Sequence, residues 1–197
     1  MYALIMAGGA GTRLNLGEKP LINICGQPMI AYVIDAFHNA GCTVIVAASP
    51  KTPMTINWCR ARDIPWYKTP GAGYVEDMVA IVQELEVHDP LFVSVSDIPC
   101  ITKEIIQRIR NSYAENRKDA LSVWIPAERV TSCRGGMPYR KTIAGTEACP
   151  AGVNILRGDR IQKEQDEFSL LFDEPRLALN VNTREDLARA GLFLEHS

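Results

Sequence analysis

The sequence has no apolar run approaching the ~20 residues of a membrane-spanning helix, and it has no long run of basic residues. Its formal net charge is −2 at pH 7. We therefore expect neither a nucleic acid nor an anionic membrane as the main partner, and no membrane insertion. Because no basic segment precedes the first apolar residues, we expect no signal peptide. We therefore expect a cytoplasmic location.

The cysteines and histidines lack the spacings of metal or redox sites. None of the six cysteines forms a C-x-x-C pair, and the three histidines are scattered. Several cysteines sit inside apolar segments of a chain without a secretion signal. This favours structural thiols in the reduced state over disulfides.

What the sequence does have is ordinary globular composition and a regular alternation of elements. A hydrophobic content of 47% over 197 residues suits one domain spanning residues 1–197. Strand and helix patterns alternate over the first half, which predicts an α/β fold, Rossmann-like, with a mostly parallel central sheet and helices on both faces. We expect strands at residues 2–6, 43–47, 64–67, 91–95, 121–125, 151–156 and 177–181, and helices at residues 28–39, 55–61, 74–85 and 161–172, with two more capped by Thr102 and by Thr183 with Asp186.

A glycine-rich loop directly after the first strand is the strongest chemical signal. Glycine lets the backbone approach a ligand closely, and its free N–H groups can point at phosphate oxygens. An arginine and a lysine nearby supply positive charge. The pattern predicts a nucleoside triphosphate site, although a simple turn is the alternative for the glycines alone. The residues assigned to it are Met6, Ala7, Gly8, Gly9, Gly11, Thr12, Arg13 and Lys19.

The spacing of this loop excludes two common nucleotide motifs. No G-x-x-x-x-G-K-[ST] follows the strand, so a Walker-type P-loop is absent. No G-x-G-x-x-G runs into a helix either, so the dinucleotide fingerprint fails.

Other polar and glycine positions fall at the ends of predicted strands. In parallel α/β sheets ligands bind beyond the carboxyl ends of the strands, so Ser49, the loop from Thr69 through Gly71 to Gly73, and Asp97 are expected to converge with the glycine-rich loop. Asp97 is either a turn cap or a Mg²⁺ ligand, and a position opposite a phosphate loop favours the metal. Gly152 inside a strand pattern suggests close approach of a ligand or another backbone.

Two of these segments resemble the sugar-phosphate-type nucleotidyltransferases. Residues 4–13, in which Ala7 to Arg13 match A-G-G-x-G-x-R, together with Lys19-Pro20-Leu21 resemble the first segment of that family, and residues 180–187 resemble its N-[IV]-N-T-x-x-D-L segment. The resemblance implies roles in catalysis for Arg13 and Lys19, and it implies that Asn182 helps Asp97 to hold the metal. It also implies that the loop at residues 69–73 reads the base. A plain turn for that loop and a helix cap at Thr183 remain the simpler alternatives.

A narrower resemblance covers nearly the whole chain. Residues 3–9, 18–22, 49–53, 73–77 and 150–154 are together similar to the archaeal-type GTP:adenosylcobinamide-phosphate guanylyltransferases. This implies a nucleotidyltransferase fold, GTP and adenosylcobinamide phosphate as partners, Mg²⁺ as cofactor, and a role in cobalamin biosynthesis. Because the Walker motif of the bifunctional bacterial enzyme is absent, transferase activity alone is expected. Residues 129–149 match nothing in the family pattern.

Two other functions stay open at this point. A molybdopterin or sugar-phosphate nucleotidyltransferase would carry the same loop, since the sequence does not rank acceptors. A nucleotide-binding regulatory subunit without catalysis is the second alternative, although the presence of Arg13, Lys19 and Asp97 argues against it. A homodimer is compatible with the sequence, which does not determine the oligomeric state.

Overall fold

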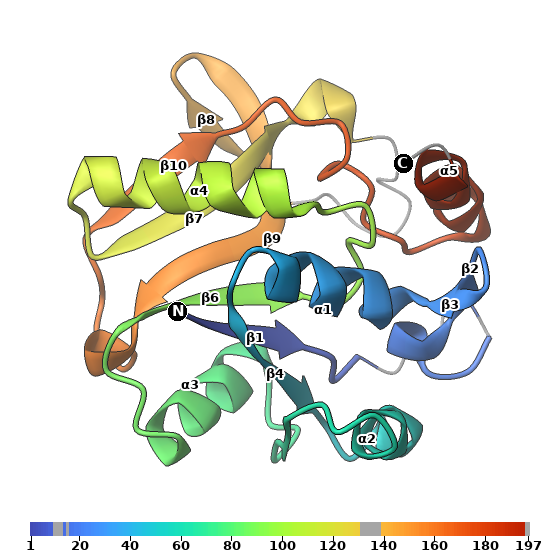
Figure 1. The fold of residues 1–197 in the computed structure, drawn as a ribbon. Helices are drawn as coiled ribbons and strands as arrows, with labels where there is room; N and C mark the ends of the chain where they lie inside the picture. Colours follow the sequence, from blue (N-terminus) through green and yellow to red (C-terminus); the bar gives the residue numbers. More distant parts are fainter. Residues whose placement is uncertain (10–13, 15, 131–138, 196–197) are drawn as a thin grey trace.

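The computed structural model describes residues 1–9, 14, 16–130 and 139–195. A central sheet runs through it in the order β10-β7-β9-β6-β1-β4-β5, with β8 paired to β9 (Figure 1). The strands of this sheet are β1 (Tyr2–Met6), β4 (Thr43–Ala48), β5 (Trp66–Lys68), β6 (Pro90–Val95), β7 (Ala120–Pro126), β8 (Lys141–Ile143), β9 (Thr146–Arg157) and β10 (Glu167–Leu171). The helices are α1 (Met29–Asn39), α2 (Pro53–Arg60), α3 (Tyr74–Glu84), α4 (Lys103–Asn116) and α5 (Arg184–Glu195), with short 3-10 turns at Lys19–Leu21, Ala127–Arg129 and Gly158–Arg160.

The sheet is mostly parallel, as the alternation of elements predicts. Strand β1 pairs in parallel with β4 and β6, β4 with β5, and β7 with β10. Strand β9 runs antiparallel to both β6 and β7. The central strands β1, β4 and β6 are near-continuous apolar runs, which is the pattern of strands buried on both faces.

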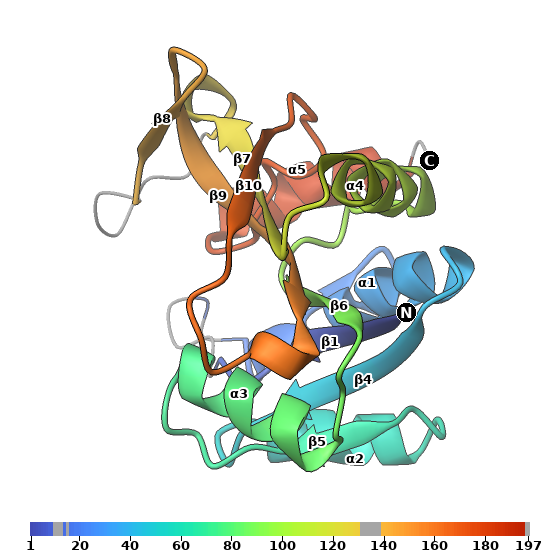
Figure 2. The same cartoon turned by 90° about the vertical axis from the view of Figure 1, so that its left-hand side faces the viewer.

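Helices cover both faces of the sheet, which confirms the predicted layering (Figure 2). Helices α1 and α4 pack on one face, where the ring of Phe37 meets the ring of Phe92 edge-on at 5.3 Å between centroids. Helix α3 packs on the other face, with Ile81 and Val82 against Leu4 of β1. Alternate residues of one strand thus face different layers, as a strand of period two requires.

The last helix completes a third, smaller cluster. Helix α5 packs beside the hairpin of β2 (Asn23–Ile24) and β3 (Gln27–Pro28), as Figure 1 shows at the right of the view. Its start has the predicted capping box: the Asp186 N–H donates to Thr183 Oγ1 at 3.1 Å, and the Thr183 N–H donates to Asp186 Oδ2 at 2.8 Å.

Two expected elements are wrong. Residues 161–172 form no helix; they contain the strand β10, which pairs in parallel with β7. Phe168 and Leu170 both pack against the core formed with α1 and α4, so a period of two prevails over the helix-favouring polar residues before them. Residues 177–181 are an irregular segment rather than a strand. They lie off the sheet, and the Val181 N–H donates instead to the Asp97 carbonyl at 2.9 Å.

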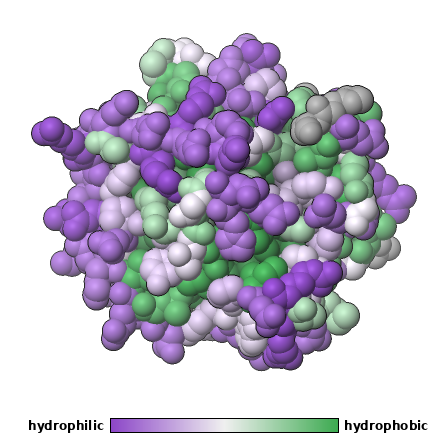
Figure 3. Space-filling view, in the orientation of Figure 1, coloured by the Kyte–Doolittle hydropathy of each residue, from purple (hydrophilic) through white to green (hydrophobic). Residues whose placement is uncertain are grey.

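Two further features of the described residues are their surface and their cysteines. No helix in the described ranges is long and apolar enough to cross a membrane. In Figure 3 hydrophilic residues cover most of the face turned to the viewer, with hydrophobic residues showing between them. Among the described residues, Cys25, Cys42, Cys59 and Cys100 form no disulfide, as expected.

Candidate active site

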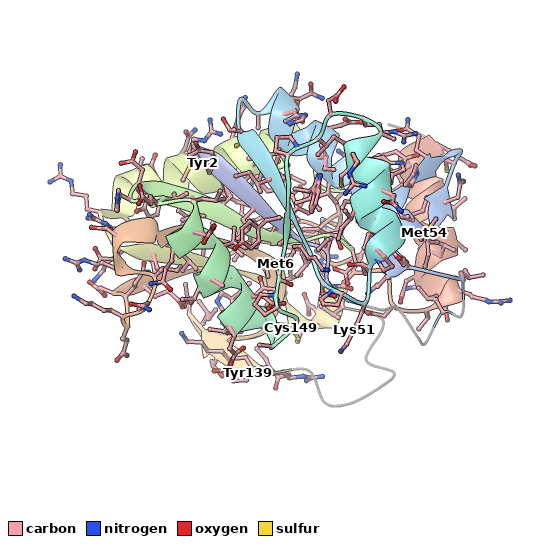
Figure 4. All side chains as sticks on the ribbon, turned by 90° about the horizontal axis from the view of Figure 1, so that it is seen from below. Tyr2, Met6, Lys51, Met54, Tyr139 and Cys149 are labelled. Atoms are coloured by element: carbon pink, nitrogen blue, oxygen red, sulfur yellow. The ribbon has the colours of Figure 1, made fainter. Side chains whose placement is uncertain are left out.

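A cavity of about 350 Å³ lies at the carboxyl ends of β1, β4 and β6. This is the edge where a parallel α/β sheet binds ligands. Figure 4 shows Tyr2 and Met6 at opposite ends of β1, and Lys51 in the turn between β4 and α2 near the Met6 end. The cavity is lined by Met6, Gly8, Gly9, Lys19, Ala47, Ser49, Lys51, Thr69, Gly71, Gly73, Tyr74, Asp77, Val95, Ser96 and Asp97.

The wall at Gly8 is built by the turn after β4. The Gly8 carbonyl accepts a hydrogen bond from Ser49 Oγ at 2.8 Å. A Cβ on Gly8 would lie 3.1 Å from the Ser49 Cβ, closer than ordinary contact. Ser49 is itself fixed, because its N–H donates to Thr52 Oγ1 at 3.1 Å. Glycine at this position allows close approach of the two loops, which brings backbone to the cavity wall.

Lys19 is held in place by its neighbour Glu18. The Glu18 carboxylate accepts hydrogen bonds from the backbone N–H groups of Met54 and Thr55, both at 2.7 Å. These are donors at the start of α2, where negative charge is stabilising. Glu18 thus ties the Lys19 segment to α2. The sequence alone gave no role to Glu18.

Lys19, Asp97 and Asn182 meet at one end of the cavity. Lys19 Nζ forms an ion pair with Asp97 Oδ2 and donates a hydrogen bond to Asn182 Oδ1 at 2.8 Å. The Lys19 and Asp97 side chains are 14% and 16% exposed. Asp97 and Asn182, which lie 78 and 163 positions from Lys19 in the sequence, are thus brought to the same lysine. Because water has little access to these two side chains, their charges are weakly screened and interact strongly with a charged ligand.

The irregular segment before α5 positions Asn182. Its Nδ2 donates to Asn180 Oδ1 at 2.7 Å, and its backbone N–H donates to Asp186 Oδ2 at 3.0 Å. The hydrogen bond from Val181 to the Asp97 carbonyl links this segment to the end of β6. The side-chain oxygen of Asn182 therefore faces the Lys19–Asp97 pair in a fixed direction.

Another part of the cavity wall is formed by the loop at residues 69–73, which lies beside Ser49 and Pro50. Asp77 organises this loop: its Oδ1 accepts from the Gly71 N–H at 2.9 Å and the Ala72 N–H at 3.1 Å, and its Oδ2 accepts from Thr69 Oγ1 at 2.7 Å. Gly71 has a φ of +76°, which glycine adopts without strain.

Tyr74 lines the same cavity. Although 44% of Tyr74 remains exposed, burial of the phenol and the negative charge of Asp97 raise its pKa to about 12. The phenol therefore stays protonated at neutral pH and offers an O–H donor beside the cavity.

Gly152 lies outside the cavity lining, and its neighbour is a side chain. It sits in β9 with a φ of +79°, and a Cβ there would lie 2.5 Å from Val95 Cγ2. Val95 lines the cavity. The sequence predicts close approach of a ligand or another backbone at Gly152, whereas the close neighbour in the structure is the Val95 side chain; a role for Gly152 in nucleotide binding stays a prediction.

The donor set fits a magnesium ion. Asp97 Oδ1 is buried and has no hydrogen-bond partner among the described residues, so one oxygen of this cavity-lining carboxylate is without a protein donor. Mg²⁺ is usually held by one or two carboxylates together with phosphate oxygens and water, which is compatible with Asp97 and Asn182. The described ranges contain no group of three or more His, Cys, Asp or Glu residues that could hold a metal by themselves.

The structure gathers most of the predicted site residues at this cavity. Asn182 joins through its bond to Lys19, while Ala7 is buried behind the lining, where its N–H donates to the Ala47 carbonyl at 2.7 Å. Gly11, Thr12 and Arg13 lie outside the described residues. Lining residues that sequence reasoning missed are Ala47, Lys51, Tyr74, Asp77, Val95 and Ser96. Their position in the sequence could have indicated them. Each lies in or beside a strand end or loop at the carboxyl edge of the sheet, where parallel α/β sheets bind ligands.

Comparison with known proteins identifies the family of the chain. Residues 3–185 match the MobA-like NTP transferase domain family. The adenosylcobinamide-phosphate guanylyltransferase of Methanocaldococcus jannaschii is 32% identical, over 99% of this chain and 98% of that protein. A mannose-1-phosphate guanyltransferase of Pichia angusta is 48% identical over 52 residues, which cover 24% of this chain and 14% of that protein.

Solved structures show the same fold at low sequence identity. A CMP:2-keto-3-deoxy-manno-octonic acid synthetase complexed with CTP superposes with a TM-score of 0.73 at 18% identity, covering 99% of this chain and 98% of that one. A hypothetical transferase from Thermus thermophilus has a TM-score of 0.71 at 15% identity, covering 95% of this chain and 100% of that one.

Fold, cavity and relatives together define a nucleotidyltransferase. The chain belongs to the MobA-like NTP transferase family, and within it to the family of the full-length archaeal guanylyltransferase relative.

Proposed function

We propose that this protein transfers GMP from GTP to adenosylcobinamide phosphate, producing adenosylcobinamide-GDP and pyrophosphate in cobalamin biosynthesis. The observation that carries the proposal is the meeting of Lys19, Asp97 and Asn182 at a cavity that the loop at residues 69–73 also lines. The full-length similarity to an adenosylcobinamide-phosphate guanylyltransferase supports the choice of donor and acceptor.

The phosphates of GTP occupy the end of the cavity lined by Gly8, Gly9 and Lys19 in this proposal. Lys51, which lines the same cavity, adds a second positive charge. Backbone N–H groups of the glycine-rich loop and these lysines stabilise the negative charge of the triphosphate. Arg13 is assigned to the leaving pyrophosphate on the family resemblance alone.

Mg²⁺ is held by Asp97 in this proposal, with Asn182 supporting the same position. The unpartnered Asp97 Oδ1 supports the assignment. When bound, the ion would neutralise charge on the phosphate oxygens and help to align them. Lys19 pairs with Asp97 Oδ2, so a cation of the protein itself balances the charge of this carboxylate.

The chemical step needs no general base on the protein. The acceptor is a phosphate ester whose second pKa is about 6, so its attacking oxygen is already deprotonated at neutral pH. That oxygen forms a bond to the α-phosphorus of GTP while the bond from the α-phosphorus to the α–β bridging oxygen breaks. The leaving group is pyrophosphate, and Lys19 stabilises the charge that develops on the phosphates. Positioning and charge neutralisation then account for catalysis.

Titration calorimetry and an acceptor panel test this proposal. We expect GTP to bind more tightly than ATP, CTP or UTP. In a panel of acceptors that contains adenosylcobinamide phosphate, molybdopterin and sugar phosphates, we expect pyrophosphate release only with adenosylcobinamide phosphate. Equal affinity for all four nucleotides would remove the guanine assignment. Turnover with a sugar phosphate or molybdopterin, and none with adenosylcobinamide phosphate, would assign the protein to the branch of the family that uses that acceptor.

A further inference from the structure

One buried carboxylate beside the proposed base site belongs to neither the phosphate end nor the proposed metal position. Asp77 is 6% exposed, although it lies in the first turns of a surface helix. A buried charge costs several kcal/mol unless it is well paired, so its hydrogen bonds need an explanation. No ion pair to it is present in the described part of the chain. Its partners are instead the two backbone N–H groups and the Thr69 hydroxyl described above.

These bonds fix the direction of the peptide groups in the loop. The N–H of one residue and the C=O of the residue before it point in opposite directions across a planar trans peptide. Because the Gly71 and Ala72 N–H groups point at Asp77, the carbonyls of Pro70 and Gly71 point away from it. The same carboxylate holds the Thr69 hydroxyl, so Thr69, which is 3% exposed, uses its donor within the protein.

The backbone N–H groups of residues 71 and 72 are bound to Asp77, so the loop offers a ligand its carbonyl acceptors. Guanine carries donors at N1–H and N2–H₂, whereas adenine carries an acceptor at N1. A carbonyl facing guanine is therefore paired, and the same carbonyl facing adenine N1 is left unpaired, which weakens binding of the adenine nucleotide by about tenfold or more. This asymmetry is the kind that yields strong selectivity between bases.

We propose that Asp77 is a positioning residue that sets the guanine preference of the site by turning the backbone donors of residues 71 and 72 inward and leaving loop carbonyls for the base. We assign Asp77 an action through the loop, because every side-chain hydrogen bond it makes in the described part of the chain joins it to residues 69, 71 and 72. The inference rests on the proposed guanylyltransferase function, since it assumes that the base lies at residues 69–73.

The test compares Asp77→Asn with two other variants of the same region. Asp77→Asn keeps one accepting oxygen but removes the negative charge that strengthens the bonds to the Gly71 and Ala72 N–H groups. Thr69→Val removes one bond to Asp77 while leaving its carboxylate. Glu84→Gln, at the exposed far end of α3, is the control with the same change in charge. Affinities for GTP, ITP, ATP and inorganic triphosphate are measured by calorimetry, and folding is checked by circular dichroism.

We expect the ratio of GTP to ATP affinity to fall by about tenfold or more in Asp77→Asn, the factor one lost hydrogen bond is worth. Thr69→Val should lose part of the same preference, and both variants should keep the wild-type affinity for inorganic triphosphate. Loss of discrimination between GTP and ITP would identify the N2 amino group as the one that the loop recognises.

Three outcomes would overturn the inference. The first is an Asp77→Asn variant with the wild-type base preference. The second is an equal loss of affinity for triphosphate and GTP, which indicates a collapsed site. The third is a Thr69→Val variant that keeps the wild-type preference for GTP over ATP while the Asp77→Asn variant loses it completely. That result would indicate that Asp77 contacts the base directly. If Asp77→Asn does not fold, Thr69→Val decides alone. A wild-type protein that binds all nucleotides equally contradicts the proposed function instead.

Discussion

Replacing Asp97 by Asn removes one negative charge from the end of the cavity and changes little else. The side chain keeps its size, and its amide oxygen can still accept a hydrogen bond from Lys19. The variant therefore separates a metal ligand, which needs the charge, from a turn cap, for which Asn and Asp are comparable. Within the described chain the Asp97 carboxylate accepts no backbone N–H bond, so the structure offers no cap for Asn to replace.

The expected cost in stability is small and the expected cost in activity is large. Removing one partner of a fully buried ion pair costs about 3–5 kcal/mol, but Lys19 keeps Asn182 as an acceptor and both charged side chains are partly exposed. We expect the free energy of unfolding to fall by about 1–2 kcal/mol. Loss of metal-assisted charge stabilisation of about 3 kcal/mol corresponds to about a hundredfold lower rate.

The assay is guanylyl transfer over a Mg²⁺ series, with urea denaturation on the same preparations. The predicted result is a rate about a hundredfold lower that recovers only in part at high Mg²⁺, with GTP binding reduced less than turnover. A near-normal rate at low Mg²⁺ would refute the metal role and return Asp97 to a structural one.

Three further predictions follow from individual contacts. Gly8→Asp should abolish nucleotide binding without unfolding the protein, because it places a carboxylate at the phosphate wall; calorimetry showing normal GTP affinity would contradict this. Gly152→Ala should lower the free energy of unfolding by about 1–3 kcal/mol, because a Cβ there meets a neighbouring side chain at positive φ; urea denaturation measures the loss, and an unchanged midpoint would count against the contact. Alkylation at about pH 8 should modify the exposed Cys25 well before Cys59 and Cys100, whose pKa values burial raises to about 11 and about 12, so that thiolate forms only at higher pH; peptide mapping with equal labelling would contradict this.

The sequence predicts the parts of this protein in which local pattern and tertiary structure agree. The apolar runs of β1, β4 and β6 are followed by turn residues, so their strand ends and the convergence of Gly8, Ser49 and Asp97 could be inferred from topology. Helix α5 was also predictable, since Thr183 and Asp186 have the spacing of a capping box.

The parts that could not be predicted depend on contacts distant in sequence. Polar residues of high helix propensity precede Phe168, and only pairing with β7 makes that region a strand. Asp77 and Glu18 look like ordinary acidic residues near helix starts, and only the fold shows which backbone N–H groups they bind. The place of Asn182 came from family resemblance, because the irregular segment that holds it has no periodic pattern.

Mass spectrometry of the reaction products tests the central claim most directly. The protein is mixed with GTP, Mg²⁺ and adenosylcobinamide phosphate, with Glu84→Gln as the matched active control and Asp97→Asn as the variant expected to be impaired. The account predicts adenosylcobinamide-GDP and pyrophosphate in equal amounts from the wild type and the control. Unchanged acceptor beside intact GTP, with the protein folded and GTP bound, would contradict it.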